Sequence, residues 1–281
     1  MSDSSKISPH IQEMIEQYDH DRYLTVLYAP EDKRPALCAL YAFNYEISRI
    51  RETVSEPMLG EIRLQWWREA IDDVYAGSPR PHEIMPDLAM AITTNDLSRD
   101  RLMAMIEGRA LDLYEDSPKD EAALKDYLLK TAGNLACLAA HILGQRDADD
   151  LAQELGIAWG YIGLIRAVPY HMSLKKSNMP ESLMAAHGVS DQKFLSPDKQ
   201  EVNRAVVGSL CQTAEDHLAR VRAGKKRIAA EARSLYLLSA LSRSYLKTIR
   251  KADYNPFALE EKADAFFRHL RLLSSALFNR I

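Results

Sequence analysis

Cysteine, positive charge and long apolar runs are all in short supply in this sequence, and each shortage excludes a class of protein. The three cysteines stand far apart, with no CxxC or Cys/His spacing, which disfavours a disulfide framework and a zinc site. We expect Cys38, Cys137 and Cys211 to be small buried apolar side chains. The formal net charge of −4 argues against a general nucleic-acid binder. No stretch approaches the roughly 20 apolar residues that cross a bilayer.

Motifs of several enzyme classes are also missing. The eight histidines form no HExxH pattern, and no GxSxG sequence is present. Gly156, Gly160 and Gly163 follow no strand, so we interpret them as contacts between close helices, not as a phosphate loop. Asp72 and Asp73 resemble a metal-binding pair, but adjacent helical side chains point about 100° apart. A solvated helix face is the favoured interpretation of this pair.

What the sequence does contain is helical periodicity along most of its 281 residues, of which 47% are hydrophobic. No sustained period-2 alternation is present, so we expect no sheet. Nothing resembles a flexible linker, and one all-α domain over residues 1–281 is expected. One long irregular stretch is predicted at about 169–198. Helices are expected over residues 8–18, 31–54, 57–76, 83–94, 99–115, 120–143, 147–168, 199–222, 226–250 and 258–279.

The two ends of the chain bear on location. The first 21 residues contain acids and no apolar core, so we expect neither a secretory signal nor an arginine-rich transit peptide, and a cytoplasmic protein. The last predicted helix is amphipathic, and its apolar stripe is interpreted as closing the core, with peripheral contact to the inner membrane or to a partner as the alternative. The residues concerned are Phe266, Phe267, Leu270, Leu273 and Leu277, against Arg268, Arg271 and Arg280.

Two segments resemble the motif regions of squalene and phytoene synthases. YLTVLYAPEDKRPALCALYAFNYEISRIRETVSE (23–56) resembles their first motif region, in which a helix reading ALYAF leads into a DDxxD-type sequence. GIAWGYIGLIRAVPYHMSLKKSNMPESL (156–183) resembles the second, with its Asn-Ile-Leu-Arg-Asp stretch, second aspartate and basic loop. RLQWWREAIDDVYAG and DYLLKTAGNLACLAAHILG match intervening helices. The resemblance implies an all-α, single-domain isoprenoid synthase-like helical bundle around a central cavity.

The chemistry of that family depends on aspartates that this sequence lacks. In the family, carboxylates on two facing helices hold Mg²⁺ ions that stabilise the leaving diphosphate. The alignment places Ser48, Arg49 and Glu52 at the acids of the first motif, and Ala167 and His171 at those of the second. Only Glu52 keeps a carboxylate. We therefore expect no catalytic residue, metal site or cofactor at these degenerate positions.

The basic residues of the family's motif regions are better retained in this sequence than the aspartates. Arg166, Lys175 and Lys176 are candidates for holding an anionic ligand without metal, and Tyr41, Asn44 and Tyr170 complete the ligand-binding candidates. Alternatives stay open. The two lysines also fit a solvated loop, and Arg166 also fits an internal ion pair. Tyr170 and His171 fit either a partner surface or the cap of a helix that Pro169 is expected to kink or end.

The departures themselves resemble one branch of the superfamily, which assists assembly of mitochondrial respiratory complex I. AFNYEISRIRETVSE and LIRAVPYHMSLKKSNMPESLMAAHGVS carry this resemblance. That branch has Phe-Asn where synthases have Phe-Cys, and Arg-Ala-x-Pro-Tyr-His where they have Arg-Asp. The resemblance implies a catalytically degenerate assembly factor for a complex I-type NADH–quinone oxidoreductase, in a bacterial or mature form. Its partners would be complex I-type subunits or assembly intermediates.

Two alternative functions remain open at the level of sequence. The first is an active Mg²⁺-dependent farnesyl or geranylgeranyl diphosphate transferase, with substitute ligands such as Glu46, Glu52, Asp112 or Glu115. The second is a metal-free binder of an isoprenoid or another lipid. A Mg²⁺-dependent product would favour the first, and ligand extracted with the purified protein would favour the second.

Overall fold

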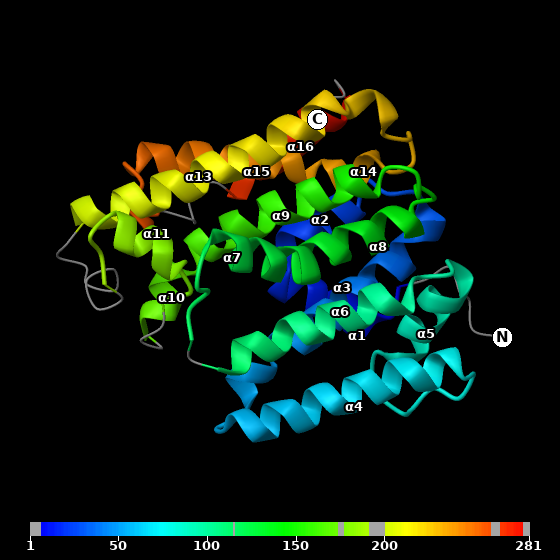
Figure 1. Cartoon of the computed structure of the whole chain (residues 1–281). Helices are drawn as coiled ribbons and strands as arrows, with labels where there is room; N and C mark the ends of the chain where they lie inside the picture. Colours follow the sequence, from blue (N-terminus) through cyan, green and yellow to red (C-terminus); the bar gives the residue numbers. More distant parts are fainter. Residues whose placement is uncertain (1–6, 115, 174–176, 191–199, 260–264, 278–281) are drawn as a thin grey trace.

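A computed structural model describes residues 7–114, 116–173, 177–190, 200–259 and 265–277, and in these residues the chain forms helices and no strand (Figure 1). The predicted all-α fold is confirmed. The α-helices are α1 (Pro9–Tyr18), α2 (His20–Val26), α3 (Arg34–Ser48), α4 (Pro57–Tyr75), α5 (Met85–Thr94), α6 (Arg99–Ala110), α7 (Glu121–Leu128), α8 (Asn134–Ile142), α9 (Asp149–Arg166), α10 (Val168–Ser173), α11 (Glu181–Ala186), α13 (Gln200–Ala223), α14 (Arg233–Tyr236), α15 (Leu238–Lys251) and α16 (Ala265–Leu277). Short turns are the 3-10 helices η1 (Glu31–Lys33), η2 (Ile50–Thr53), η3 (Leu111–Leu113), η5 (Lys225–Arg227) and η6 (Pro256–Ala258), and the π-helical η4 (Leu129–Gly133).

Local chemistry explains many of the helix ends. Pro57 begins α4, where its missing N–H is not needed and its fixed φ suits the first turn. The Ser98 side chain accepts a hydrogen bond from the backbone N–H of Arg101 at the start of α6. The Asp120 side chain does the same for Ala123 at the start of α7, at 2.8 Å. Most predicted helices therefore match observed ones to within a few residues.

Two segments differ from the prediction. Helix α2 lies between residues 18 and 31, where no helix was predicted, and it is held by the burial of Tyr23, Leu24 and Val26. The expected helix over 226–250 divides into η5, α14 and α15. The Gln145 side chain takes up two backbone groups at this break, accepting from the Ala229 N–H and donating to the Arg227 carbonyl. A side chain thus replaces helical hydrogen bonds there.

The stretch after α9 is partly helical. Helix α9 ends at Arg166, and α10 begins at Val168, so Pro169 sits in the first turn of a new helix and the predicted break is confirmed. Because α10 and α11 fall within 169–198, the expectation of an irregular segment is wrong for those residues. The predicted loop lysines, Lys175 and Lys176, lie outside the described residues.

Helix α9 is the centre of the bundle and packs against α8, η4, α13 and α15. In Figure 1, α4 and α13 lie along opposite edges of the molecule. Close packing depends on glycine: a Cβ at Gly156 would lie 2.3 Å from the Ala132 carbonyl oxygen, and one at Gly160 would lie 2.7 Å from Leu128 Cδ2. The interpretation of these two glycines as helix contacts is confirmed, whereas Gly163 faces open space.

Two further expectations concern the surface and the core. Asp72 pairs with Arg99 at 2.6 Å, and Asp73 pairs with Arg80, so this acid pair is part of a solvated helix face as expected. All three cysteines are buried, as predicted.

Helix α16 faces the core with a different side from the one expected. Leu270 and Leu273 are each 47% exposed, whereas Leu272 is fully buried and Arg268 points inward. The prediction that the apolar stripe closes the core is therefore wrong for these two leucines. A buried carboxylate that faces Arg268 is the physical reason and is described below. For Phe266, Phe267 and Leu277 the structure describes the backbone alone, and Arg280 lies outside the described residues.

Candidate functional site

The two motif regions face each other at the ends of α3 and α9. The first continues from Ser48 through Arg49 into η2, which carries Glu52. The second runs from Arg166 through Ala167 into α10, which carries Tyr170. Burial and a hydrogen bond to the Glu52 carboxylate raise the pKa of Tyr170. This phenol donates across the gap between the motifs, so the one retained carboxylate contacts the second motif directly.

Local partners engage the other residues of the first motif. The Ser48 hydroxyl donates to the Tyr45 carbonyl at 2.9 Å, so this side chain binds the backbone of its own helix. The Arg49 guanidinium lies 5.2 Å from the centre of the Tyr45 ring and 3.8 Å from the Glu46 carboxylate. A cation thus stands at a position where the sequence resemblance implies an acid, and it pairs with Glu46, one of the carboxylates considered as a substitute ligand.

The second motif is arranged around the break between its helices. The Ala167 N–H donates to the Gly163 carbonyl at 2.9 Å, completing the last turn of α9. The His171 ring lies 3.2 Å from the side-chain amide of Asn178, and the Tyr170 side chain is about half exposed. His171 thus ties α10 to the segment before α11.

Tyr41 and Asn44 are both buried on α3. Burial raises the pKa of Tyr41 above its usual range, the largest influence among those on this phenol. The Arg22 guanidinium lies over the rings of Tyr41 and Trp159, at 5.7 and 5.9 Å from their centres. A void of about 10 Å³ remains beside these three side chains, which is about the space of one water.

A buried ion cluster lies next to this aromatic group. The Asp21 carboxylate accepts from the Tyr245 hydroxyl at 2.6 Å, from Arg268 at 3.2 Å and from Arg166 at 3.4 Å. The Arg166 guanidinium also stacks on the Tyr245 ring at 3.9 Å. Sequence reasoning missed Asp21, Tyr245 and the role of Arg268. No local pattern marks them, because they come from α2, α15 and α16 and meet only in the folded chain.

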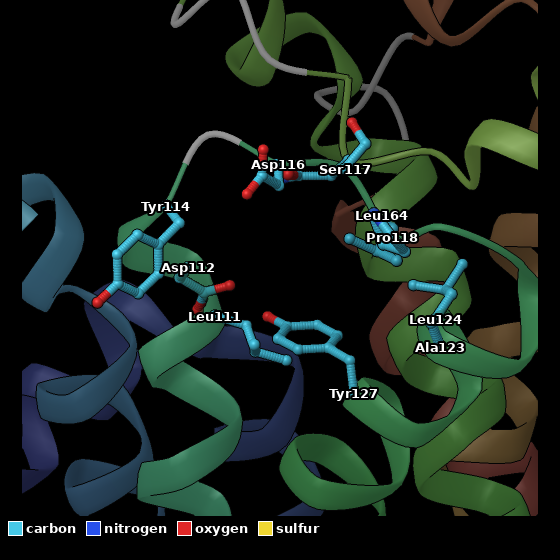
Figure 2. Close-up of a pocket in the computed structure, with 11 residues that line it drawn as sticks. Leu111, Asp112, Tyr114, Asp116, Ser117, Pro118, Ala123, Leu124, Tyr127 and Leu164 are labelled. Carbon is cyan, nitrogen blue, oxygen red and sulfur yellow. The ribbon is translucent and has the colours of Figure 1, made fainter.

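A larger pocket of about 260 Å³ opens between η3, α7 and α9 (Figure 2). Figure 2 shows the Tyr127 ring beside Asp112 and Leu111, with Asp116 across the opening. Arg109 binds the Asp112 carboxylate at 3.2 Å and donates to the Tyr127 hydroxyl at 2.9 Å. Asp112 therefore belongs to a paired network. Glu115, the neighbouring substitute ligand in the prediction, lies outside the described residues.

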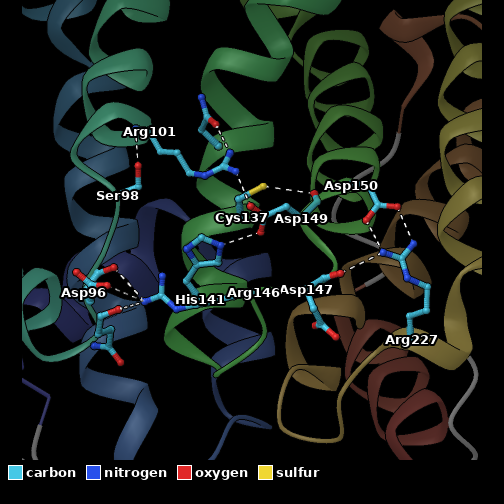
Figure 3. A network of polar contacts seen from close by, with 12 residues as sticks. Asp96, Ser98, Arg101, Cys137, His141, Arg146, Asp147, Asp149, Asp150 and Arg227 are labelled. Carbon is cyan, nitrogen blue, oxygen red and sulfur yellow. Dashed lines mark hydrogen bonds and ion pairs between the residues drawn. The ribbon is translucent and has the colours of Figure 1, made fainter.

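A separate polar network fastens the far ends of α6, α8 and α9 (Figure 3). The buried His141 Nε2 lies 2.7 Å from one Asp149 oxygen, and Arg101 binds the other at 2.5 Å. Arg101 also donates to Asn134 at 2.8 Å. Nearby, Arg227 binds Asp150 at 2.7 Å on the surface. These groups connect helices, so we interpret the network as structural.

The described residues were also considered for metal binding and for crossing a membrane. No three His, Cys, Asp or Glu side chains among them are placed to hold a metal ion together. None of the helices in the described part of the chain has the length and apolar character required to cross a membrane.

Comparison with known proteins places this arrangement in a family. The model for squalene/phytoene synthase matches residues 15–273 of the chain. The chain belongs to the squalene/phytoene synthase family. Within it, the chain is related to complex I assembly factor 6: it is 31% identical to NADH dehydrogenase (ubiquinone) complex I, assembly factor 6 of Mus musculus, over 89% of this chain and 76% of that protein. The Homo sapiens protein is 30% identical with the same coverage.

The chain is also similar to synthases. Presqualene diphosphate synthase of Rhodopseudomonas palustris is 26% identical over 63% of this chain and 64% of its own length. A crystal structure of a dehydrosqualene synthase in complex with ligand superposes with a TM-score of 0.85 at 18% identity, covering 96% of this chain and 95% of that one. At this identity the match establishes the helical isoprenoid synthase fold and nothing finer.

Proposed function

We propose that this protein is a catalytically degenerate member of its family that acts as an assembly factor for a complex I-type NADH–quinone oxidoreductase. The observation that carries the proposal is the similarity to complex I assembly factor 6 at about 30% identity over 89% of the chain. Its partner would be a complex I subunit or assembly intermediate. It would work in the cytoplasm at the inner membrane, where the exposed Leu270 and Leu273 offer apolar contact.

The geometry of the motif positions supports the loss of prenyl-transfer chemistry. Mg²⁺ requires near-octahedral oxygen ligands, usually one or two carboxylates together with water and substrate phosphates. Each candidate carboxylate among the described residues already has a protein partner: Glu46 has Arg49, Glu52 has Tyr170, and Asp112 has Arg109. Ser48, Arg49, Ala167 and His171 offer no carboxylate at all. This donor set does not fit the family's metal ions.

Deletion of the gene in its natural host tests the assembly role. We expect assembled complex I, measured by native gel and by NADH–quinone reductase activity in membranes, to fall, and a plasmid copy to restore it. The abundance of another respiratory complex in the same membranes is the control. An unchanged complex I level in the deletion strain would overturn the proposal.

The active prenyltransferase is the second candidate, and the similarity to presqualene diphosphate synthase favours it. Purified protein would be incubated with labelled farnesyl and geranylgeranyl diphosphate, Mg²⁺ and NADPH, beside an active synthase. A Mg²⁺-dependent squalene-like or phytoene-like product would establish this function.

A metal-free lipid binder is the third candidate, favoured by the mainly apolar pocket between η3, α7 and α9. Mass spectrometry of an organic extract of the purified protein tests it. Stoichiometric isoprenoid or other lipid would support it, and an extract matching the blank would remove it.

A further inference from the structure

Helix α4 has apolar residues on two of its faces. The buried residues of its inner face are Gly60, Leu64, Trp67, Ala70, Ile71 and Val74. Met58 and Ile62 lie outside this set and are 72% and 61% exposed, more than any other large apolar side chain in the described part of the chain. In Figure 1, α4 lies along an edge of the molecule. The inner face joins α4 to the bundle, so the outer apolar residues are available for contact with another molecule.

The outer face of α4 forms a shallow groove of about 480 Å³. Met58, Ile62 and Trp66 line it at intervals of four residues, so they follow one another along the same side of the helix. The Trp66 ring packs edge-on against the ring of the buried Trp67, with 5.0 Å between the ring centres. A fixed aromatic ring loses less conformational freedom on binding than a long flexible side chain does, which favours this face as an interface.

Two opposite charges follow one another along one edge of this groove. Glu61 and Arg68 are seven residues apart, or about two turns of helix, and therefore lie on the same side of α4. Their charged groups lie 3.8 Å apart, and the Tyr114 hydroxyl donates to Glu61 at 3.3 Å. Both side chains remain partly exposed. The edge thus presents an acid and then a base to a molecule that binds in the groove.

This order of charges is complementary to itself in one arrangement. When two copies of α4 pair antiparallel about a two-fold axis, each edge faces the same edge of the other copy with its order reversed. Glu61 of each copy then lies close to Arg68 of the other, whereas parallel pairing would place equal charges together. With the axis between Ile62 and Gln65, Leu59 of each copy would face Trp66 of the other. Apolar and charged residues are therefore matched in the same arrangement.

We propose that the outer face of α4 binds a second copy of this chain, in a closed antiparallel dimer about a two-fold axis. The helix has 19 residues, so it is about 28 Å long and about 10 Å wide and offers roughly 300 Å² per copy. This area is below that of a standard interface, so the dimer is weak, with a Kd of about 10 to 100 µM. The proposal does not rest on the role in complex I assembly.

Sedimentation equilibrium of the full-length chain, from about 5 to about 500 µM, tests the proposal. The parent protein should pass from monomer to dimer over this range. Ile62→Glu should raise the Kd more than about tenfold, because two carboxylates would meet beside the axis. Leu27→Glu is the matched control, since Leu27 at the end of α2 is 44% exposed and lies outside this face. Its Kd should equal that of the parent protein.

A pair of charge reversals tests the antiparallel arrangement directly. Glu61→Arg and Arg68→Glu should each weaken self-association about tenfold, because like charges would then face each other across the axis. An equimolar mixture of the two variants should recover the parent Kd to within about threefold. The mixture joins a copy with two cations on this edge to a copy with two anions. Circular dichroism should show parent-like helix content in every variant, since the changed side chains are at least partly exposed.

Three results would overturn the proposal. The first is a parent protein that stays monomeric at about 500 µM, which would leave this face of α4 to a different protein or to a membrane. The second is a dimer whose Kd is unchanged by Ile62→Glu, since the interface would then lie elsewhere. The third is a mixture of Glu61→Arg and Arg68→Glu that associates no better than either variant alone. This last result decides even if Ile62→Glu does not fold.

Discussion

Asp149 and Asp150 are neighbours in the first turn of α9, yet their surroundings differ sharply. Asp149 binds the buried His141 and Arg101, whereas Asp150 binds Arg227 on the surface and is 60% exposed. Both carboxylates interact with the same helix dipole, so this contribution cancels in a comparison. The comparison therefore sets a partly buried carboxylate with two partners against an exposed carboxylate that binds Arg227.

We expect Asp149→Asn to lower the free energy of unfolding by about 3 kcal/mol, because an amide N–H₂ would face the Arg101 guanidinium in a partly buried site. Asp150→Asn should cost less than about 1 kcal/mol, since exposed ion pairs contribute little. Urea unfolding monitored by circular dichroism measures both. Equal losses would show that the network in Figure 3 contributes no more than a surface pair.

Glu154 gives the protein a sensitivity to acid that can be assigned to one residue. Burial alone would raise its pKa, but hydrogen bonds from His217 and Arg220, at 2.6 Å each, outweigh burial and hold the pKa below its ordinary value near 4.5. A lowered pKa in the folded state stabilises the protein above the pKa of the unfolded chain. This contribution is lost as the pH falls through the folded pKa.

Glu154→Gln should therefore destabilise the protein at neutral pH by about 2 kcal/mol, and this difference should shrink steadily below about pH 4.5. Urea midpoints of parent and variant between pH 7 and pH 3.5 provide the measurement. Glu215→Gln, which removes a more exposed pair between α13 and Arg250 of α15, should change stability by less than about 1 kcal/mol. A difference for Glu154→Gln that is constant across this range would contradict the assignment.

Single residues also mark the limit of what the sequence predicts about the candidate site. The degenerate motif positions could be located because they lie within recognisable segments. The pairing of Glu52 with Tyr170 could not, since it depends on how α10 turns after Ala167. Asp21 carried no signal, because an isolated aspartate in a seven-residue helix is typical of a surface until tertiary contacts bury it.

At the level of elements, proline, capping residues and apolar period were sufficient to predict most helices. They failed where a tertiary contact replaced a local preference. Gln145 binds the backbone between η5 and α14, where a continuous helix was predicted. Asp21 binds Arg268, so the charged side of α16 faces the core. Both contacts join residues more than 80 positions apart, so no window of local sequence could contain them. Periodicity identified α16 as amphipathic but gave no information about which face meets the core.

Helix α9 supplies a direct test of close packing. A Cβ at Gly156 would approach backbone atoms of η4, with the Ala132 oxygen at 2.3 Å and the Gly133 Cα at 2.8 Å, and backbone cannot rotate away as a flexible side chain can. Gly156→Ala should therefore lower the free energy of unfolding by about 3 kcal/mol. Gly163→Ala on the same helix meets nothing within 4 Å and should raise stability by up to about 1 kcal/mol, the usual gain in helix propensity.

Guanidinium unfolding of the two alanine variants decides between packing and propensity. Opposite signs are expected. If both variants were stabilised, α9 and η4 would have to separate without cost, and the close approach at Gly156 would not be part of the folded state in solution.

At the level of the whole molecule, the requirements of the fold can be separated from those of the motif positions. The chain superposes on a dehydrosqualene synthase with a TM-score of 0.85, while four of the positions at which the sequence resemblance implies acids carry Ser48, Arg49, Ala167 and His171. Packing of α9 against its neighbours requires small and apolar residues at the interface but no carboxylate at the helix ends. A bundle of this kind can therefore keep its architecture whether or not carboxylates occupy these helix ends.

The three cysteines report on the integrity of this architecture, because each lies in a different helix. Cys38 is on α3, Cys137 on α8 and Cys211 on α13, and burial raises the pKa of each thiol to about 12. Only the thiolate reacts rapidly with a disulfide reagent, so at pH 8 the folded protein should react only as fast as its helices open. The same chain in guanidinium chloride should release three equivalents at once, with ordinary thiol pKa values restored.

Three equal slow rates that follow the unfolding rate would indicate one cooperative bundle. A single fast-reacting thiol would instead identify the helix that opens first. Replacing that cysteine by serine should then remove the fast phase of the reaction, which would confirm the assignment to that helix.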